Sequence, residues 1–211
     1  MQNIPGNLDH LIYVSSDLQK GMEEIEALLG VRPVEGGQHP NFGTHNAVVS
    51  LGDAVYLEIL APDPELPAPA RGRLFQDRFS RPFGLANWVL RTDAIEDLYT
   101  KVVAQGLGIG RVEKGERVKP DGTVLSWYLT DPYPLPFDGA IPFLISWGNS
   151  PHPAASAPDA GKLTRMQINH PHPEAVLKYL DLLDVGIIVE KSLTFNLIAE
   201  IETPQGNVLL K

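Results

Sequence analysis

"LDHLIYVSSDLQKGMEEIEALLG", residues 8–30, changes its hydrophobic period midway, and this change decides the fold. Residues 8–14 are rich in β-branched and aromatic side chains, which favours a strand. Ser16 or Asp17 can then cap a helix that Gly30 ends. The apolar residues of this helix recur at helical spacing: Leu18, Met22, Ile25, Leu28 and Leu29. The stretch therefore predicts a strand followed directly by a helix.

Three more strands follow this pair. They are predicted at 31–37, 44–52 and 54–62, and the last two are joined by a hairpin turn at Gly52-Asp53. Pro33 favours an edge position for the first of them, because proline cannot donate a hydrogen bond to a neighbouring strand. The local order is therefore one strand, one helix and three strands.

The same order recurs twice along the chain. A second run is predicted as a strand at 84–92, a helix at 93–108 capped by Asp93, two strands around an Asp121-Gly122 turn, and a strand at 140–148. A third run begins at Lys162, and its helix at 172–185 carries Pro173 in the first turn. We therefore predict an α+β fold of repeated βαβββ modules, which form a curved, mostly antiparallel sheet around a cleft.

Composition divides the chain into five segments. They are a first module at 1–61, an inter-module insert at 62–83, a second module at 84–148, a linker at 149–161, and a third, shorter module at 162–211. The insert begins with a proline-rich stretch, and the linker has almost no large apolar residues.

Charge and cysteine content exclude several classes of function. The 211 residues carry a net charge of −9, which argues against nucleic acid and against an anionic membrane surface as partners. The chain has no cysteine, so any metal must be held by His, Asp, Glu, Asn, Gln or Tyr. We see no signal peptide and no apolar run of about 20 residues, so we predict a cytoplasmic protein.

Glu58 lies within the apolar run "YLEIL", where an ionised carboxylate needs compensation if the strand is buried. Either Glu58 faces water on a half-exposed strand, or it points into a cleft. Strand alternation places Glu58 on one face with Tyr56 and Leu60. In the first strand, the same alternation places His10 on one face with Leu8, Ile12 and Val14, and Asp9 on the other with Leu11 and Tyr13.

Four pieces of sequence, in order, resemble the glyoxalase-like domain family of the vicinal oxygen chelate superfamily. They are "LDHLIYVSSDL", the run from "GVRPV" through "GTHNA" to "YLEILAPDP", "GLANWVLRT" and "IPFLISWG", and they cover residues 8–148. The resemblance implies βαβββ modules that pair around a cleft. It also implies a divalent metal ion, of unknown identity, held by the first and last strands of each module. On this sequence those positions are His10 and Glu58.

The second and third modules depart from that metal pattern. The matching positions are Asn87, Arg165 and Leu210, and the strand at 140–148 has no acidic residue. A third ligand would have to come from His45, His39 or Asn87, of which His45 is the best candidate. The metal set predicted from the resemblance is therefore His10, His45 and Glu58.

Two functions remain open, and both have a small molecule as partner. In the first, the protein is an isomerase, lyase or ring-opening dioxygenase, with Glu58 as base or ligand and His10 as ligand or proton carrier. In the second, it is a non-catalytic binding protein that sequesters a small molecule, as bleomycin-resistance relatives do. A third alternative, a vestigial cleft in a fold that serves assembly, has no direct support.

For the remaining histidines, arginines and tryptophans, the sequence indicates structural roles. His170 and His172 lie where a strand passes into a helix, which favours a helix start over a metal pair. The insert contains four arginines, Arg71, Arg73, Arg78 and Arg81. They could clamp an anionic substrate, but a charged helix face or a homodimer contact is the favoured interpretation. Trp88, Trp127 and Trp147 fit core or cleft-wall packing.

Overall fold

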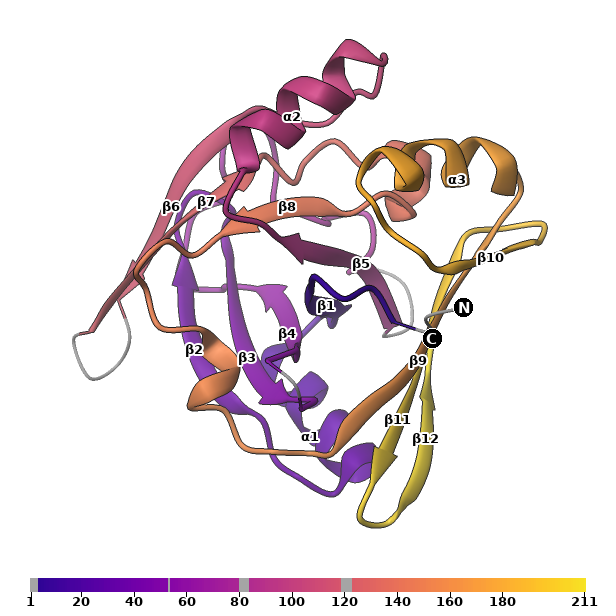
Figure 1. Cartoon of the computed structure of the whole chain (residues 1–211). Coiled ribbons are helices and arrows are strands. Elements are labelled where there is room, and N and C mark those ends of the chain that lie inside the picture. Colours follow the sequence, from indigo (N-terminus) through magenta and orange to yellow (C-terminus); the bar gives the residue numbers. More distant parts are fainter. Residues whose placement is uncertain (1–3, 53, 80–83, 119–122) are drawn as a thin grey trace.

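The computed structural model describes residues 4–52, 54–79, 84–118 and 123–211 (Figure 1). The first unit contains β1 (Leu8–Val14), α1 (Leu18–Leu29), β2 (Val34–His39), β3 (Thr44–Ser50) and β4 (Tyr56–Pro62). The second contains β5 (Gly84–Arg91), α2 (Ile95–Ala104), β6 (Val112–Val118), β7 (Val124–Thr130) and β8 (Phe143–Ser146). The third contains β9 (Lys162–His170), α3 (Pro173–Leu182), β10 (Ile188–Lys191), β11 (Asn196–Thr203) and β12 (Gly206–Leu210). Short 3₁₀ turns, η1 (Pro136–Gly139) and η2 (Pro153–Ala155), follow β7 and β8.

The helix ends show which capping signals the chain uses. Asp17 caps α1, because its side chain accepts a hydrogen bond from the Lys20 amide, and Gly30 ends the helix in the left-handed conformation with φ 76°. Our prediction that Asp93 caps α2 is wrong, since the helix begins one residue later, after Ala94, with no side-chain cap. Asp53 and the Asp121-Gly122 turn lie outside the described residues.

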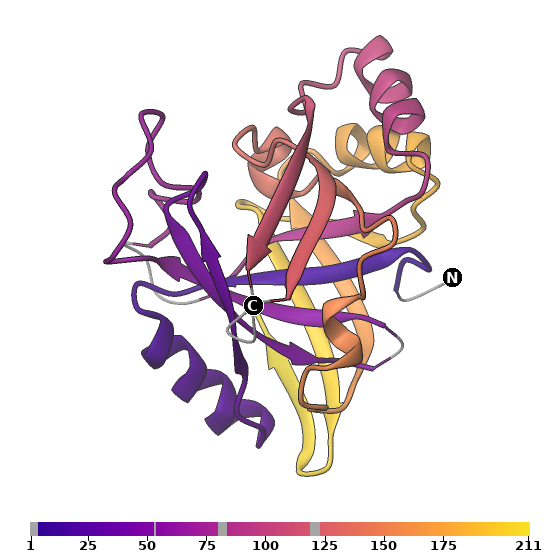
Figure 2. The ribbon, with the colours of Figure 1, turned by 90° about the vertical axis from the view of Figure 1, so that its left-hand side faces the viewer.

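Strands of the first two units form one eight-stranded sheet in the order β2-β3-β4-β1-β5-β8-β7-β6. In each unit the first strand pairs in parallel with the last, and β1 and β5 pair antiparallel at the centre. The sheet is curved, so that its edge strands β2 and β6 approach each other (Figures 1 and 2). A Cβ built on Gly36 of β2 would lie against the guanidinium of Arg117 in β6. The fold is thus the expected α+β fold, with a nearly closed sheet.

The third unit repeats the order of elements but not the strand pairing. Its sheet has the order β10-β9-β11-β12. The first strand of the unit, β9, therefore pairs in parallel with β10 and antiparallel with β11. This small sheet joins the large one through backbone hydrogen bonds, from Leu85 to the Lys211 carbonyl (3.0 Å) and from Leu163 to the Leu51 carbonyl (3.0 Å). A common apolar core contains residues of β1, β4, β5, α1 and β9, among them Leu11, Leu57, Trp88, Ile25 and Met166.

A bulge in β1 changes which residues share a face. The pairing of β1 with β5 shifts register between Leu8 and His10, so Asp9 is an extra residue. Leu8 therefore packs in the common core with Leu11, and our placement of Leu8 beside His10 is wrong. The placement of Ile12 and Val14 on the other side of the sheet is correct.

The segment expected to be a linker is anchored to the first unit. Ser50 donates a backbone hydrogen bond to the Pro158 carbonyl (2.8 Å) and accepts one from Ala160 (3.0 Å). Among the helices of the described residues, none has the length and apolarity needed to cross a membrane.

Candidate functional site

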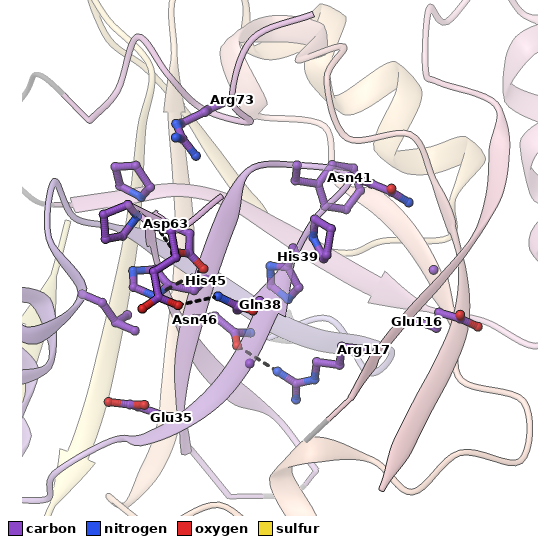
Figure 3. Close-up of a pocket in the computed structure, with 18 of the residues that line it drawn as sticks. Glu35, Gln38, His39, Asn41, His45, Asn46, Asp63, Arg73, Glu116 and Arg117 are labelled. Atoms are coloured by element: carbon purple, nitrogen blue, oxygen red, sulfur yellow. Dashed lines mark hydrogen bonds and ion pairs between the residues drawn. The ribbon is translucent and has the colours of Figure 1, made fainter. Parts of the chain in front are cut away.

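Two adjoining hollows, an outer groove and an inner pocket, lie at the large sheet, and the inner pocket is lined by His10 and Glu58. The outer groove has a volume of about 1090 Å³, and the inner pocket beside it has a volume of about 60 Å³. Their shared lining residues are His39, Phe42, Asn46, Arg117, Trp127 and Leu129. Figure 3 shows the outer groove, with His39, His45 and Asn46 on one side and Arg117 on the other. The inner pocket has room for a few atoms, so a ligand would place one end there and the rest in the groove.

Glu58 points into the inner pocket and is 8% exposed. Asn46 of β3 donates a hydrogen bond from Nδ2 to Glu58 Oε1 (2.5 Å). His10 of β1 places Nε2 3.7 Å from Glu58 Oε2. The two sequence-predicted residues therefore meet in one cleft, where the hydrogen bond from the Asn46 amide compensates the buried carboxylate.

Arg117 reaches the same cleft from β6 and is 6% exposed. Its Nη1 donates to Asn46 Oδ1 (2.8 Å), so Asn46 links the guanidinium to the Glu58 carboxylate. Among the described residues, Arg117 Nε is buried with no hydrogen-bond partner. The Arg117 side chain lines both hollows, and a guanidinium in such a place suits an oxygen of a carboxylate or carbonyl. No local pattern in the sequence pointed to this residue, because β6 reaches β2 and β3 only when the sheet curves.

His10 is held by a carboxylate that strand alternation had placed on the opposite face. Asp9 Oδ1 lies 2.7 Å from His10 Nδ1, and Asp9 Oδ2 accepts from Trp147 Nε1 (3.0 Å) and lies 3.1 Å from His152 Nε2. The His10 ring also stacks on Tyr56, with ring centroids 4.4 Å apart. The bulge in β1 explains this arrangement, since it breaks the alternation that would separate Asp9 from His10.

Burial and hydrogen bonding shift three pKa values in and around the inner pocket. Burial alone would raise the pKa of Asp9, but hydrogen bonds and charge from His10 and His152 lower it below the usual range. Desolvation raises the pKa of Tyr56 well above 10.0, helped by the nearby Asp9 and Glu58 carboxylates. Desolvation also lowers the pKa of His39 to about 4.

His45 does not join His10 and Glu58. In the pairing of β3 with β4, His45 faces Ala61, whereas Val48 faces Glu58, so His45 lies on the alternate face. It lines the outer groove, with Nδ1 3.9 Å from Asp63 Oδ2. His39, the other histidine considered as a third ligand, is the last residue of β2 and lines both hollows.

The residues present do not fit the divalent metal ion that the family resemblance implies. Within the described ranges, no three His, Asp or Glu side chains are grouped to hold a metal ion. Asn46 turns its amide nitrogen to Glu58, and its oxygen accepts from Arg117, whose positive charge would oppose a cation. Asn87 lines neither hollow, and its side-chain oxygen accepts a hydrogen bond from the Trp88 amide (2.6 Å), so it does not join His10 and Glu58.

The remaining clusters have structural contacts. His170 Nδ1 accepts from the His172 amide (3.0 Å), and His172 precedes α3, with Pro173 at its start, as predicted. The described arginines of the insert bond to neighbouring groups: Arg71 to Asp131 (2.7 Å), Arg73 to the Gly43 and Leu66 carbonyls, and Arg78 to the Asp138 carbonyl (2.5 Å). Arg81 lies outside the described residues. Trp127 and Trp147 line the inner pocket, and Trp88 is in the core.

Two βαβββ units that share a central antiparallel strand pair and enclose a cleft define a protein of the vicinal oxygen chelate class. The chain belongs to the glyoxalase-like domain family, whose profile matches residues 8–183. A search of curated proteins finds no match.

Solved structures are similar to this one in fold. A hypothetical protein from Staphylococcus aureus is similar at a TM-score of 0.68 and 16% identity, over 92% of this chain and 91% of that one. Methylmalonyl-CoA epimerase from Mycobacterium tuberculosis has a TM-score of 0.43 and 20% identity, over 74% of this chain and 96% of that one. A variant of the Streptomyces coelicolor methylmalonyl-CoA epimerase, in complex with 2-nitronate-propionyl-CoA, has a TM-score of 0.46 and 17% identity, over 67% and 97% of the two chains.

Proposed function

We propose that this protein binds a small apolar molecule through its carboxylate or carbonyl oxygen and moves a proton on it, as an isomerase or lyase. The observation that carries the proposal is the linked set of Glu58, Asn46 and Arg117 in one pocket, with His10 beside Glu58. The Glu58 carboxylate, from β4, and the Arg117 guanidinium, from β6, can then contact the same bound molecule.

The chemistry follows from these positions. Glu58 takes a proton from carbon beside the ligand's carbonyl, and the electron pair of the broken C–H bond moves onto the carbonyl oxygen. Arg117 stabilises the negative charge that develops there, which is the role of a fixed donor in a site with little water. The proton returns to carbon from Glu58 or from His10, so nothing is oxidised or reduced. A dioxygenase would need a redox metal, and this donor set does not fit one.

The charges of the outer groove narrow the class of ligand. Its lining includes six carboxylates, from Asp17, Glu35, Asp63, Glu65, Glu113 and Glu116, and three basic side chains, from Arg73, Lys114 and Arg117. Such a groove disfavours a polyphosphate tail and accepts a neutral or cationic one. Phe42 and Trp127, which line both the groove and the inner pocket, suit an aromatic or aliphatic body.

A second candidate, sequestration without chemistry, is favoured by this aromatic lining. Trp127 and Trp147 pack on each other at the wall of the inner pocket, with ring centroids 5.5 Å apart and ring planes tilted by 55°; Trp127 also lines the outer groove, where a flat molecule can stack on it. Binding alone would need the aromatic wall and Arg117, but neither Glu58 nor His10.

Deuterium incorporation separates the two candidates. The protein is incubated in D₂O with phenylpyruvate and other aryl 2-oxo acids, and exchange at the carbon beside the carbonyl is followed by proton NMR. We expect exchange above the uncatalysed rate, with a loss of about 100-fold or more in Glu58→Gln, since it lacks the base. Glu96→Gln, on the exposed face of α2, is the matched control and should keep the full rate.

Binding is measured in the same samples by quenching of tryptophan fluorescence. Arg117→Lys should weaken binding by about tenfold or more, because lysine lacks the guanidinium fork and its N–H groups. Arg111→Lys, at an exposed position before β6, controls for the change in chemistry. Binding without exchange throughout the panel would favour sequestration, and absence of both would contradict the proposed ligand class.

A further inference from the structure

We propose that Asp9 is a positioning residue, which holds His10 in the tautomer that carries its proton on Nδ1 and so leaves Nε2 free to exchange a proton with Glu58. This inference deepens the proposed proton transfer and rests on it. Asp9 itself does not line the inner pocket, but it contacts two residues that do, His10 through Oδ1 and Trp147 through Oδ2.

Asp9 is an unusual carboxylate. It is fully buried in the central strand of the large sheet, where an ionised group is costly unless donors surround it. In the described part of the chain its ion-pair partners are two histidines, His10 and His152, and Trp147 adds an indole N–H. These donors come from β1, from the residue after β8 and from the start of η2, so three separate segments converge on one carboxylate.

The two oxygens of Asp9 have different partners. Trp147 Nε1 can only donate, and its distance to Oδ2 is 3.0 Å. His152 Nδ1 accepts from the Ala154 amide (3.3 Å), so the His152 proton is on Nε2, which lies 3.1 Å from the same Oδ2. Both contacts fix Oδ2 and leave Oδ1 for His10, at 2.7 Å.

The tautomer of His10 follows from this geometry. An ionised carboxylate only accepts hydrogen bonds, so neutral His10 must place its proton on Nδ1. Its Nε2 then presents a lone pair 3.7 Å from Glu58 Oε2. Rotation of the Glu58 carboxylate about its last torsion can shorten this distance, because that torsion is broad. After Glu58 has taken a proton from the ligand, Nε2 can receive it, and the imidazolium lies between two carboxylates.

The tautomer is measured directly in the wild-type protein. Long-range ¹H–¹⁵N NMR on protein labelled in its histidines distinguishes the protonated ring nitrogen, with His10 assigned through its backbone. We expect His10 to carry its proton on Nδ1 at pH 8. A proton on Nε2 would overturn the proposal without the need for any variant.

Asp9→Asn provides the second test. In this variant the Trp147 and His152 N–H groups donate to the single side-chain oxygen of the asparagine. Its NH₂ group therefore donates to His10 Nδ1, and the His10 proton moves to Nε2. We expect proton exchange on phenylpyruvate to fall by about 100-fold or more, while KM changes by less than about threefold. Asp93→Asn, an exposed change of the same charge, should alter neither.

The outcomes separate this inference from the proposed function. A folded Asp9→Asn protein with the proton still on Nδ1 and a full exchange rate would overturn the role of Asp9. Should Asp9→Asn fail to fold, the wild-type tautomer decides. Wild-type protein with the Nδ1 proton but no exchange on any tested acid would contradict the proposed proton transfer, and would still support Asp9 as the residue that orients His10.

Discussion

Glu58 and Asp9 show how amide, imidazole and indole groups stabilise single buried carboxylates in this fold. Glu58 is held by the amide of Asn46 and faces the imidazole of His10, and Asp9 is held by two histidines and an indole. Hydrogen bonds to an ionised group are worth about 1.5–3 kcal/mol each, so removal of one partner leaves a costly buried charge. The polar residues of the cleft therefore contribute to the stability of the fold as well as to the site.

His39 is predicted to make stability depend on pH. Desolvation lowers its pKa to about 4, against 6.5 for the unfolded chain. Between these values the unfolded state binds a proton that the folded state does not, so the free energy of unfolding decreases as the pH falls from about 6.5 to about 4. The decrease is at most about 1.4 kcal/mol per pH unit.

Urea unfolding of wild type and His39→Gln at pH 7.5 and pH 5 checks this prediction. The variant should lose less stability on acidification than wild type, because it lacks the group that titrates. His172→Gln, at an exposed position, is the control and should follow wild type. Equal losses in all three proteins would mean that His39 titrates normally in the folded state.

Local sequence pointed to one part of the candidate site and missed its other residues for physical reasons. His10 and Glu58 follow from strand alternation together with the family resemblance, and they do meet. Asn46 and Arg117 were missed, because their contact depends on how far the sheet curves, which no local pattern records. Asp9 was assigned to the wrong face, since alternation carries no sign of a bulge.

Among the elements, the edge strands β2 and β6 bring the two sides of the cleft together through small residues. A Cβ on Gly36 of β2 would collide with Asn46 Oδ1 and with Arg117 Nη1 of β6. The proline and glycine content of β2 predicts an edge strand. That β6 approaches this edge depends on the curvature of the whole sheet, which the local sequence does not determine. Glycine here is needed for close approach, not for a turn.

Gly36→Ala should therefore disturb the link between Arg117 and Asn46. We expect a loss of about 1–3 kcal/mol in stability from overpacking, and a weaker affinity for aryl 2-oxo acids. Thermal unfolding and tryptophan quenching measure the two effects. Gly108→Ala is the control, because nothing lies within 4 Å of its Cβ position. Unchanged affinity in Gly36→Ala would show that ligand binding does not need the contact between these edges.

At the scale of the whole molecule, the third unit belongs to the same core as the first two. Met166 of β9 is fully buried in the cluster that contains Leu11 of β1 and Trp88 of β5. The repeated order of elements predicted a third module, but hydrophobic periodicity does not determine strand order, and this unit pairs its strands differently from the first two. The module boundaries at 61, 84, 148 and 162 remain a prediction about folding units.

Met166→Ala tests whether those units unfold together. The substitution leaves a cavity in the common core and should cost about 2–5 kcal/mol. All three tryptophans lie between residues 84 and 148, so their fluorescence reports on the second unit, whereas far-ultraviolet circular dichroism reports on the whole chain. Because the core is shared, we expect both signals to shift to the same lower midpoint in urea, while Leu193→Ala, at a position 96% exposed, shifts neither. A fluorescence midpoint that stays at its wild-type value while the circular dichroism develops an earlier transition would make the third unit an independent folding domain.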